Sequence, residues 1–125
     1  MTQVSITRVS SFDAAHFLAG HKGKCARMHG HTYRIEVEVV RGGGLDMHGM
    51  VMDFGDLDEV IQQSVIDPLD HRLLNDILSD PTAERIALYA LERIQEGLPS
   101  GVSVRRVRVW ETPDSYAEVT NARGE

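Results

Sequence analysis

One thiol and two imidazoles lie within seven residues of this chain, in the sequence Cys25-Ala-Arg-Met-His29-Gly-His31. Residues two apart in a β-strand point to the same face, and the alternation that begins at His29 continues through apolar residues to Val39. His29 and His31 therefore project together from the buried face of a predicted strand. Buried imidazoles need partners, and two that converge are well placed to share a metal ion. His16, at the end of an earlier apolar run, is the third candidate ligand.

Two kinds of zinc site fit this spacing. Three histidines with an open fourth position are typical of catalytic zinc. Cys25 as a fourth ligand would instead close the site and make it structural. The spacing alone permits both arrangements. His21 and His48 are interpreted as ordinary hydrogen-bonded or surface residues.

Cys25 also has the surroundings of a reactive thiol. Lys24 and Arg27 lie beside it, and positive neighbours favour the thiolate form. Asp70 and His71 could supply a proton shuttle, because a carboxylate beside an imidazole can orient it. Such dipeptides are common in loops, so this pair alone is weak support for the role.

Glu111 is the remaining candidate. It ends a predicted strand on the same face as Val107 and Val109, so it points inward, where an unpaired carboxylate is costly. An internal basic partner would satisfy it, and so would a ligand with two adjacent N–H donors. The residue type does not choose between them.

The elements that must position these residues can be predicted from hydrophobic spacing. Strands are expected over residues 4–16 with a bulge near 8–10, then over 29–40, 50–52, 102–111 with a break near Arg105 and Arg106, and 116–120. Helices are expected over 53–66, ended by Pro68, and from an N-cap at Asp80 to Gly97. Hairpin-length connections favour antiparallel pairing. The pattern predicts an α+β sandwich with both helices on one face of the sheet.

Length and composition indicate one globular domain over residues 1–125, with 42% hydrophobic and 26% charged residues. A single cysteine excludes an intramolecular disulfide and favours a reducing compartment. No apolar run approaches the roughly 20 residues of a membrane span. No signal peptide is visible either, so we expect a cytoplasmic protein.

The net charge of −6 argues against a general nucleic-acid binder, which would present a basic face. Positive side chains nevertheless gather in the loop before the histidine pair, at Lys22, Lys24 and Arg27. Such a loop either attracts anions locally or is an ordinary solvated surface.

Six motifs follow one another along nearly the whole chain. They are Phe12-Asp-Ala-Ala-His16, Cys25-x-x-x-His29-Gly-His31, Asp53-Phe54-x-x-Leu57, Leu69-Asp70-His71-x-x-Leu74-Asn75, Pro81-Thr82-x-Glu84 and Trp110-Glu111-Thr112. Together they resemble the 6-pyruvoyl-tetrahydropterin synthase family, and most closely its bacterial branch, which forms 6-carboxy-tetrahydropterin. The spacing of Cys25 and His29 and the run that ends at Pro113 also resemble that branch.

The resemblance implies the tunnelling fold (T-fold), in which antiparallel sheets of several subunits join into a barrel with the helices outside. It implies a homohexamer, a dimer of trimers, with active sites between subunits. The zinc ligands would be His16, His29 and His31.

The resemblance also implies roles for the other candidates. Cys25 would be the proton acceptor, and Asp70 with His71 the relay. Glu111 would anchor the pterin ring. Thr82 and Glu84 would line the pterin pocket from a neighbouring subunit.

The implied reaction converts 7,8-dihydroneopterin triphosphate to 6-carboxy-5,6,7,8-tetrahydropterin, acetaldehyde and triphosphate, in queuosine biosynthesis. The basic loop would then bind the triphosphate through Lys22, Lys24 and Arg27, an assignment that rests on charge and not on the resemblance. Three alternatives remain: a 6-pyruvoyl-tetrahydropterin synthase, which eliminates triphosphate and keeps the three-carbon side chain, a non-catalytic structural zinc module, and a non-catalytic pterin binder. The joint presence of the thiol and the relay argues against the last.

Overall fold

The computed structural model describes residues 2–21 and 23–121, and of Lys24 it describes the backbone alone. Four antiparallel strands form one sheet in the order β1 (Ser5–His16), β2 (His29–Arg41), β3 (Val102–Thr112) and β4 (Ser115–Thr120). The helices are α1 (Phe54–Ile61), α2 (Asp67–Leu69) and α3 (Ala83–Gly97). Shorter helical turns are η1 (Gly23–Ala26), η2 (Gln62–Ile66) and η3 (Leu74–Asp76).

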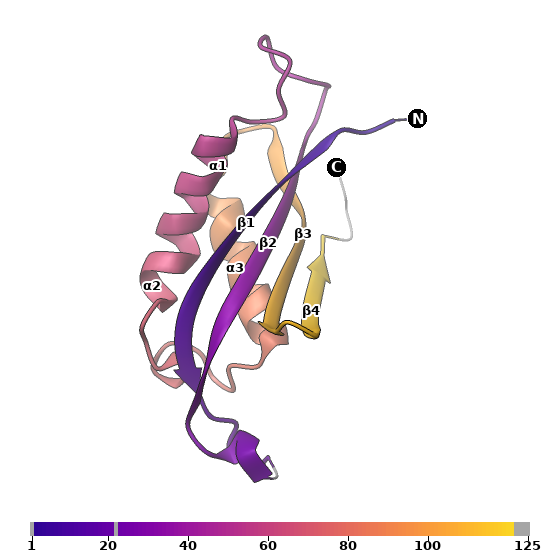
Figure 1. The fold of residues 1–125 in the computed structure, drawn as a ribbon. Coiled ribbons are helices and arrows are strands. Elements are labelled where there is room, and N and C mark those ends of the chain that lie inside the picture. The colour runs from indigo at the N-terminus through magenta and orange to yellow at the C-terminus, as the bar shows by residue number, and fades with distance from the viewer. Residues whose placement is uncertain (1, 22, 122–125) are drawn as a thin grey trace.

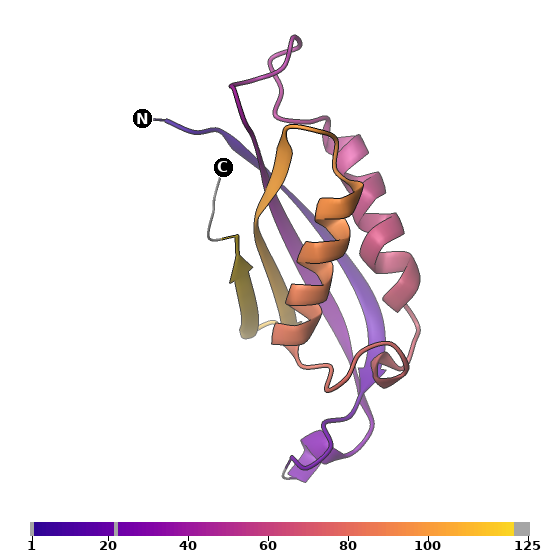
Figure 2. The ribbon, with the colours of Figure 1, turned by 180° about the vertical axis from the view of Figure 1, so that it is seen from behind.

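The helices cover one face of the sheet. Figures 1 and 2 show α1 and α3 side by side over that face, while the opposite face carries no helix in the described part of the chain. The core lies between the two layers and holds the inward-facing valines and isoleucines of β2 and β3 with the apolar stripe of α3. The predicted two-layer α+β architecture is confirmed.

The strand β1 runs without the predicted bulge. Its ladder with β2 has no shift from its first residue to its last. Arg8 and Ser10 keep inward-facing positions because α1 and the helical turn after it present polar partners. Arg8 Nε lies 3.4 Å from the Asp58 carboxylate, and Gln62 Nε2 donates to Ser10 Oγ at 3.0 Å. Val9 is simply a valine on the exposed face, so the prediction of a bulge is wrong.

The predicted strand over residues 50–52 is also wrong, because this segment forms no strand. Val51 and Met52 are buried in the core all the same. The loop that carries them is folded on itself, since the carboxylate of Asp46 accepts the backbone N–H groups of His48 and Met50. The apolar run therefore indicated burial and not strand pairing, and the sheet has four strands.

The break in alternation predicted near Arg105 and Arg106 is confirmed as a bulge. Glu38 pairs with Arg106 while Val39 pairs with Val104, which leaves Arg105 opposite no residue of β2. The extra residue lets valines on both sides of the bulge stay buried.

The first helix begins as predicted, with the Asp53 carboxylate accepting the N–H of Asp56 at 3.0 Å. It continues through the π-helical segment η2 and ends at Leu69, one residue beyond Pro68. Proline has no N–H for the carbonyl four residues earlier and its ring collides with that carbonyl. The wider π turn just before Pro68 removes this conflict.

The second helix, α3, is capped by Thr82 and not by Asp80, so the predicted cap is wrong by two residues. Thr82 Oγ1 accepts the N–H of Arg85 at 3.2 Å, whereas Asp80 has a φ of 47° and forms a turn before the helix. The helix ends at Gly97 as predicted. A Cβ at Gly97 would lie 3.0 Å from the Val60 side chain, so glycine also permits the close approach of α3 to α1.

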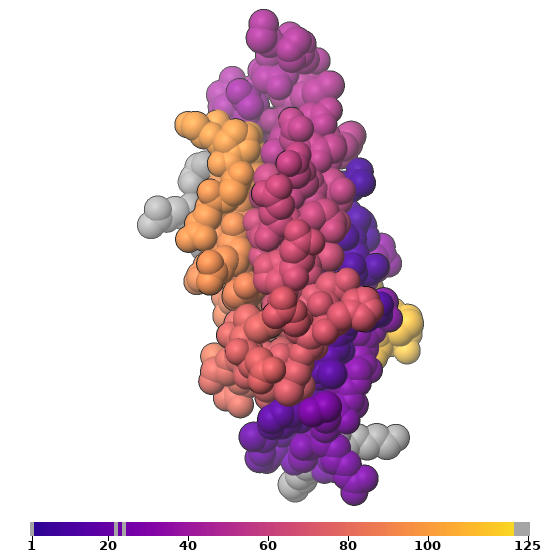
Figure 3. Space-filling model, turned by 90° about the vertical axis from the view of Figure 1, so that its left-hand side faces the viewer, coloured from indigo at the N-terminus to yellow at the C-terminus, as the bar shows by residue number. Residues whose placement is uncertain are grey.

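Residues 70–75, here called the edge segment, run along the outer edge of β1. His71 N–H donates to the Asp13 carbonyl at 2.6 Å, and Ala15 N–H donates to the Arg72 carbonyl at 3.0 Å. The pairing is parallel, with a bridge between Ala15 and Leu73. This segment (red) lies just above the projecting loop between β1 and β2 (purple) at one end of the molecule (Figure 3).

Candidate metal centre and active site

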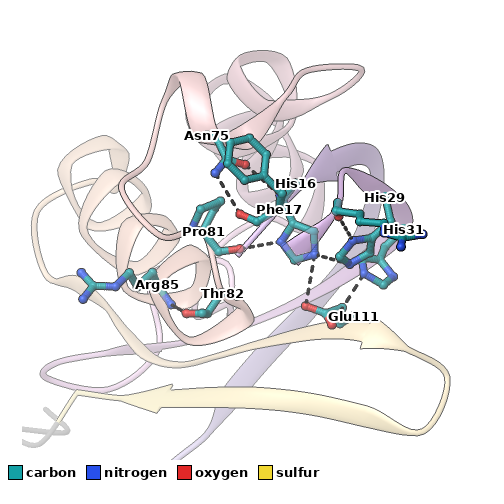
Figure 4. A network of polar contacts seen from close by, with 10 residues as sticks. His16, Phe17, His29, His31, Asn75, Pro81, Thr82, Arg85 and Glu111 are labelled. Atoms are coloured by element: carbon teal, nitrogen blue, oxygen red, sulfur yellow. Dashed lines mark hydrogen bonds and ion pairs between the residues drawn. The ribbon is translucent and has the colours of Figure 1, made fainter. Parts of the chain in front are cut away.

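Three imidazoles meet where β1 and β2 end and begin. His16 pairs with His29 across the two strands, and His31 lies two residues further along the same face of β2. The Nε2 atoms of His16 and His29 are 3.1 Å apart, and all three histidines offer ligand atoms within 4.8 Å of one another. The structure therefore brings together His29 and His31, which the alternation placed on one face, and His16, the third candidate (Figure 4).

The hydrogen bonds of the outer ring nitrogens determine which lone pairs are free. His16 Nδ1–H donates to the Pro81 carbonyl at 2.7 Å, and His29 Nδ1–H donates to the Arg27 carbonyl at 2.7 Å. In the neutral form each of these imidazoles carries its single N–H on Nδ1, which makes Nε2 an acceptor. Two acceptors 3.1 Å apart cannot bond to each other, but both can bind one cation. The donor set thus fits zinc.

His31 provides the third lone pair. Burial lowers the pKa of His31, the neighbouring Glu111 carboxylate opposes the shift, and His16 and His29 add to it. The lowered pKa favours the neutral imidazole, which carries a free lone pair. Its Nε2 is buried and has no hydrogen-bond partner within residues 2–21 and 23–121.

Glu111 faces this cluster from the end of β3. Its carboxylate lies 3.6 Å from His31 Nε2 and 3.9 Å from His16 Nε2, beyond hydrogen-bond distance. It lines a cavity of about 560 Å³ with His31 and Trp110, and a second of about 450 Å³ with Thr82 and Glu84. The structure thus brings Thr82 and Glu84 of the same chain together with Glu111, whereas the resemblance implied that they reach the pocket from a neighbouring subunit.

Asp70 and His71 form the predicted pair. His71 Nδ1 lies 3.0 Å from Asp70 Oδ2, while Asp70 Oδ1 accepts the N–H of Asp13 at 2.9 Å. The Asp13 N–H, and after it the His71 imidazole, holds the pKa of the Asp70 carboxyl below its usual value. His71 also lines a cavity of about 600 Å³ together with His31, so the pair faces the same space as one of the candidate metal ligands.

Cys25 lies in η1, half-buried, in the loop between β1 and β2. Its carbonyl accepts the N–H of Leu18 at 2.7 Å, which ties the loop close to His16. The possible ligand cluster around His16 does not include Cys25 among the described residues. Arg27 is exposed in the same loop, whereas Lys22 and the Lys24 side chain lie outside the described residues.

Tyr33 is a member of this site that the sequence did not single out. It is fully buried, and its ring contacts the rings of His16 and His31 edge-on, with centroids 5.9 and 5.4 Å away. Burial, and then the charge of Glu111, raises the pKa of its hydroxyl. The alternation predicted that Tyr33 faces inward with His29 and His31, but tyrosine on a buried face is common.

His21 and His48, interpreted from the sequence as ordinary residues, lie outside the cluster. His48 is in the exposed loop after β2. His21 lines the cavity shared by Glu111 and Thr82, and its backbone N–H donates to the Leu18 carbonyl.

The family model for 6-pyruvoyl tetrahydropterin synthase matches residues 5–122. The chain belongs to the 6-pyruvoyl tetrahydropterin synthase family. The resemblance inferred from the six motifs is therefore confirmed, and the chain is an enzyme of this pterin synthase family. No helix in the described residues is both long and apolar enough to cross a membrane.

Three similar proteins place the chain within this family. It is 40% identical over 120 residues to the 6-carboxy-5,6,7,8-tetrahydropterin synthase of Synechocystis sp., covering 90% of each chain. It is 43% identical over 102 residues to the dihydroneopterin monophosphate aldolase of Pyrococcus furiosus, covering 82% of this chain and 84% of that one. The structure of Caenorhabditis elegans 6-pyruvoyl tetrahydropterin synthase matches with a TM-score of 0.82 at 30% identity, covering 98% of each chain.

Proposed function

We propose that this protein is a zinc-dependent carbon–carbon lyase that converts 7,8-dihydroneopterin triphosphate and water to 6-carboxy-5,6,7,8-tetrahydropterin, acetaldehyde and triphosphate, in queuosine biosynthesis. The observation that carries the proposal is the convergence of three histidine side chains beside Glu111. Such a site binds a metal and leaves room for substrate. The proposed protein is a single domain over residues 1–125 and acts in the cytoplasm.

His16, His29 and His31 would hold the zinc ion through their Nε2 atoms. When bound, zinc supplies a Lewis acid that lowers the pKa of the hydroxyl groups on the substrate side chain. The Pro81 and Arg27 carbonyls hold two of the rings in the required tautomer. Tyr33 packs edge-on against the rings of His16 and His31.

The protein residues would bind the pterin and move its protons. Glu111 accepts two adjacent N–H groups of the pterin ring, as a carboxylate does from a bidentate donor. The Cys25 thiolate removes a proton from a side-chain carbon, and His71 returns one. Asp70 orients the His71 ring through the 3.0 Å contact to Nδ1.

Thr82 and Glu84 would line the pterin pocket at the start of α3, in the cavity that they share with Glu111. The triphosphate would lie against the basic loop, at Lys22, Lys24 and Arg27. The chain carries a net charge of −6, so a local excess of positive charge is the feature that attracts a polyanion. This places the phosphates on the same loop as the thiol.

The proposed assembly is a homohexamer of two trimers, whose sheets join into a barrel with active sites at the subunit interfaces. Two strand edges support this. On the side away from β2, the first half of β1 pairs with no strand in the described residues, and neither does the outer side of β4. Open edges of a small sheet are usually covered.

A second candidate function is aldol cleavage of dihydroneopterin monophosphate, favoured by the Pyrococcus furiosus relative. The two relatives are almost equally similar to this chain, so identity alone does not separate them. Aldol cleavage leaves the phosphate on the two-carbon aldehyde and releases neither acetaldehyde nor triphosphate. A third candidate, the pyruvoyl synthase reaction, releases triphosphate without an aldehyde.

The products therefore decide between the three reactions. The zinc-loaded protein is incubated separately with the triphosphate and the monophosphate of dihydroneopterin, and aldehydes are trapped as hydrazones and identified by mass spectrometry. Acetaldehyde equimolar with triphosphate supports the proposal. Triphosphate without an aldehyde indicates the pyruvoyl reaction, and a phosphorylated aldehyde from the monophosphate indicates the aldolase. Cys25→Ala controls for uncatalysed breakdown, and no turnover of either substrate would favour a structural zinc module.

A further inference from the structure

The edge segment ends at Asn75, whose side chain makes the two hydrogen bonds to β1's continuation that a strand backbone would otherwise make. Asn75 Oδ1 accepts the N–H of Phe17 at 3.0 Å, and Asn75 Nδ2 donates to the carbonyl of Phe17 at 2.9 Å (Figure 4). The carboxamide thus satisfies both polar groups of one residue, as a neighbouring strand would. Because donor and acceptor each have a partner, the amide can take only one orientation.

Phe17 lies between two parts of the proposed active site. It directly follows His16, whose ring is fully buried and bonded to Pro81. It directly precedes Leu18, whose N–H donates to the Cys25 carbonyl at 2.7 Å. A shift of the Phe17 backbone would therefore move a metal ligand on one side and the thiol-bearing turn on the other.

We infer that Asn75 is a positioning residue that holds the metal ligand His16 and the Cys25 loop in register with each other. Asn75 acts through Phe17 and touches neither the metal nor the reacting atoms. The inference rests on the proposed function, because it requires His16 to be a ligand and Cys25 to be the base. It assigns to the last residue of the Leu69–Asn75 motif a task different from that of Asp70 and His71.

The chain contains a matched control for this pair. Gln95 in α3 donates from Nε2 to the Val102 carbonyl at 3.3 Å and accepts the N–H of Val104 at Oε1, at 2.8 Å. It is the same kind of bond between a carboxamide and a strand backbone. The bonded residues Val102 and Val104 lie at the opposite end of β3 from Glu111, away from the histidines.

The test compares Asn75→Asp with Gln95→Glu. Asn75→Asp keeps an acceptor for the Phe17 N–H but places a carboxylate oxygen against the Phe17 carbonyl. Zinc affinity is measured by competition with a chelator, and the reactivity of Cys25 by its rate of alkylation with iodoacetamide at pH 7.5. The chain has one cysteine, so this rate reports on Cys25 alone. Thermal unfolding checks the fold of each variant.

We expect Asn75→Asp to weaken zinc binding about tenfold, as removal of an outer positioning group does, and to raise the alkylation rate several-fold as the half-buried thiol is released. Gln95→Glu should lower the unfolding temperature about as much as Asn75→Asp does. It should change neither the zinc affinity nor the alkylation rate of Cys25. A folded Asn75→Asp with native zinc affinity and native alkylation rate overturns the inference. So do equal changes in both variants.

If Asn75→Asp does not fold, Asn75→Ala removes the pair without adding a charge and is measured in the same way. Loss of fold in both, with Gln95→Glu folded, would show a structural role and overturn the positioning role. Neither measurement needs turnover, so a different product leaves the inference standing. If the native chain does not bind zinc, the proposed function fails, and the alkylation rate still decides whether Asn75 positions the Cys25 loop.

Discussion

The Nδ1–H of His16 donates to the carbonyl of Pro81 across 65 residues of sequence, at 2.7 Å. The residue just before the N-cap of α3 thereby fixes the tautomer of a histidine on β1. The two layers of the fold meet at this bond, and the lone pair that it leaves on Nε2 points at His29. The direct consequence is a group of histidines that could hold a metal ion.

We therefore expect one zinc ion per chain in the native protein and less than a tenth of that in His16→Ala, since two remaining imidazoles make a weak site. Cys25→Ala should keep full zinc and lose turnover, because the thiol is proposed as base and not as ligand. Metal content is measured by atomic emission after gel filtration. His48→Ala, a change of histidine in an exposed loop, is the control and should keep both. Loss of zinc from Cys25→Ala would instead indicate a closed structural site.

Glu111→Gln should leave the fold and zinc content unchanged and weaken the binding of neopterin by about ten- to a hundredfold. A charged hydrogen-bonding partner contributes roughly 1.5–3 kcal/mol, and the amide would direct a donor at a donor. Binding is measured by the quenching of pterin fluorescence. Glu118→Gln is the control, because Glu118 lines the same cavity but is held by Arg108 at 2.6 Å. Equal affinity in Glu111→Gln and the native chain would show that Glu111 does not bind the pterin.

His71 has a φ of 58°, in the left-handed region that non-glycine residues rarely adopt. Asparagine tolerates this region and β-branched residues do not. His71→Asn should thus be close to native in stability but inactive, whereas His71→Val should be destabilised by about 1–2 kcal/mol. Unfolding in urea measures the difference. The same two substitutions at exposed Arg72 should differ much less, and an equal difference there would contradict the explanation from backbone strain.

Asp70 should contribute to stability in acid. Its pKa is below the ordinary value of 3.8, so the contribution is present above pH 3.8 and disappears as the pH falls through the lower native pKa. Asp70→Asn should therefore be less stable than the native chain at pH 6, with the difference shrinking below pH 3.8. Urea midpoints between pH 6 and pH 3 test this. Asp46→Asn should show the same convergence but keep turnover, since Asp46 is in the loop after β2. A constant difference across the range would rule out the Asp70 bonds as its cause.

The assembly can be tested at the open half of β1. Asp13 and Ala15 turn their backbone groups away from β2, so by alternation Thr7 does the same. Light scattering of the native chain should give a multiple of three subunits, most simply six. Thr7→Pro removes an outward N–H and should reduce the particle to a folded single chain, whereas Ile6→Pro removes a bond to β2 and should unfold it. A native particle that is a stable, active monomer would contradict the barrel.

The fold was predictable where the residue pattern reports burial. Alternation placed His29, His31 and Glu111 on one face, and the extra residue at Arg105 appeared as a break in that alternation. Local chemistry misled where two signals compete. Asp80 before proline has the composition of a cap, but Thr82 is the residue with extended backbone at the helix start.

The contacts between distant segments could not be predicted. Nothing local shows that the polar residues Arg8 and Ser10 on β1 meet Asp58 and Gln62 on the helix. The Pro81 carbonyl is an ordinary backbone group whose partner depends on how the helix layer docks. The same holds for the pairing of residues 70–75 with β1, because any exposed strand edge could have accepted them.

The edge segment has two roles, since it covers an open strand edge and carries a pair of residues proposed to act in catalysis. An unpaired strand edge is a template for intermolecular β-pairing, and residues 70–75 cover the part of β1 that ends at the candidate metal centre. The same residues carry the Asp70–His71 pair. Release of this segment by heat or denaturant would therefore disrupt the proposed relay and expose an unpaired strand edge in one event. Loss of turnover and the onset of aggregation should share one transition temperature, which makes light scattering a direct monitor of active-site integrity.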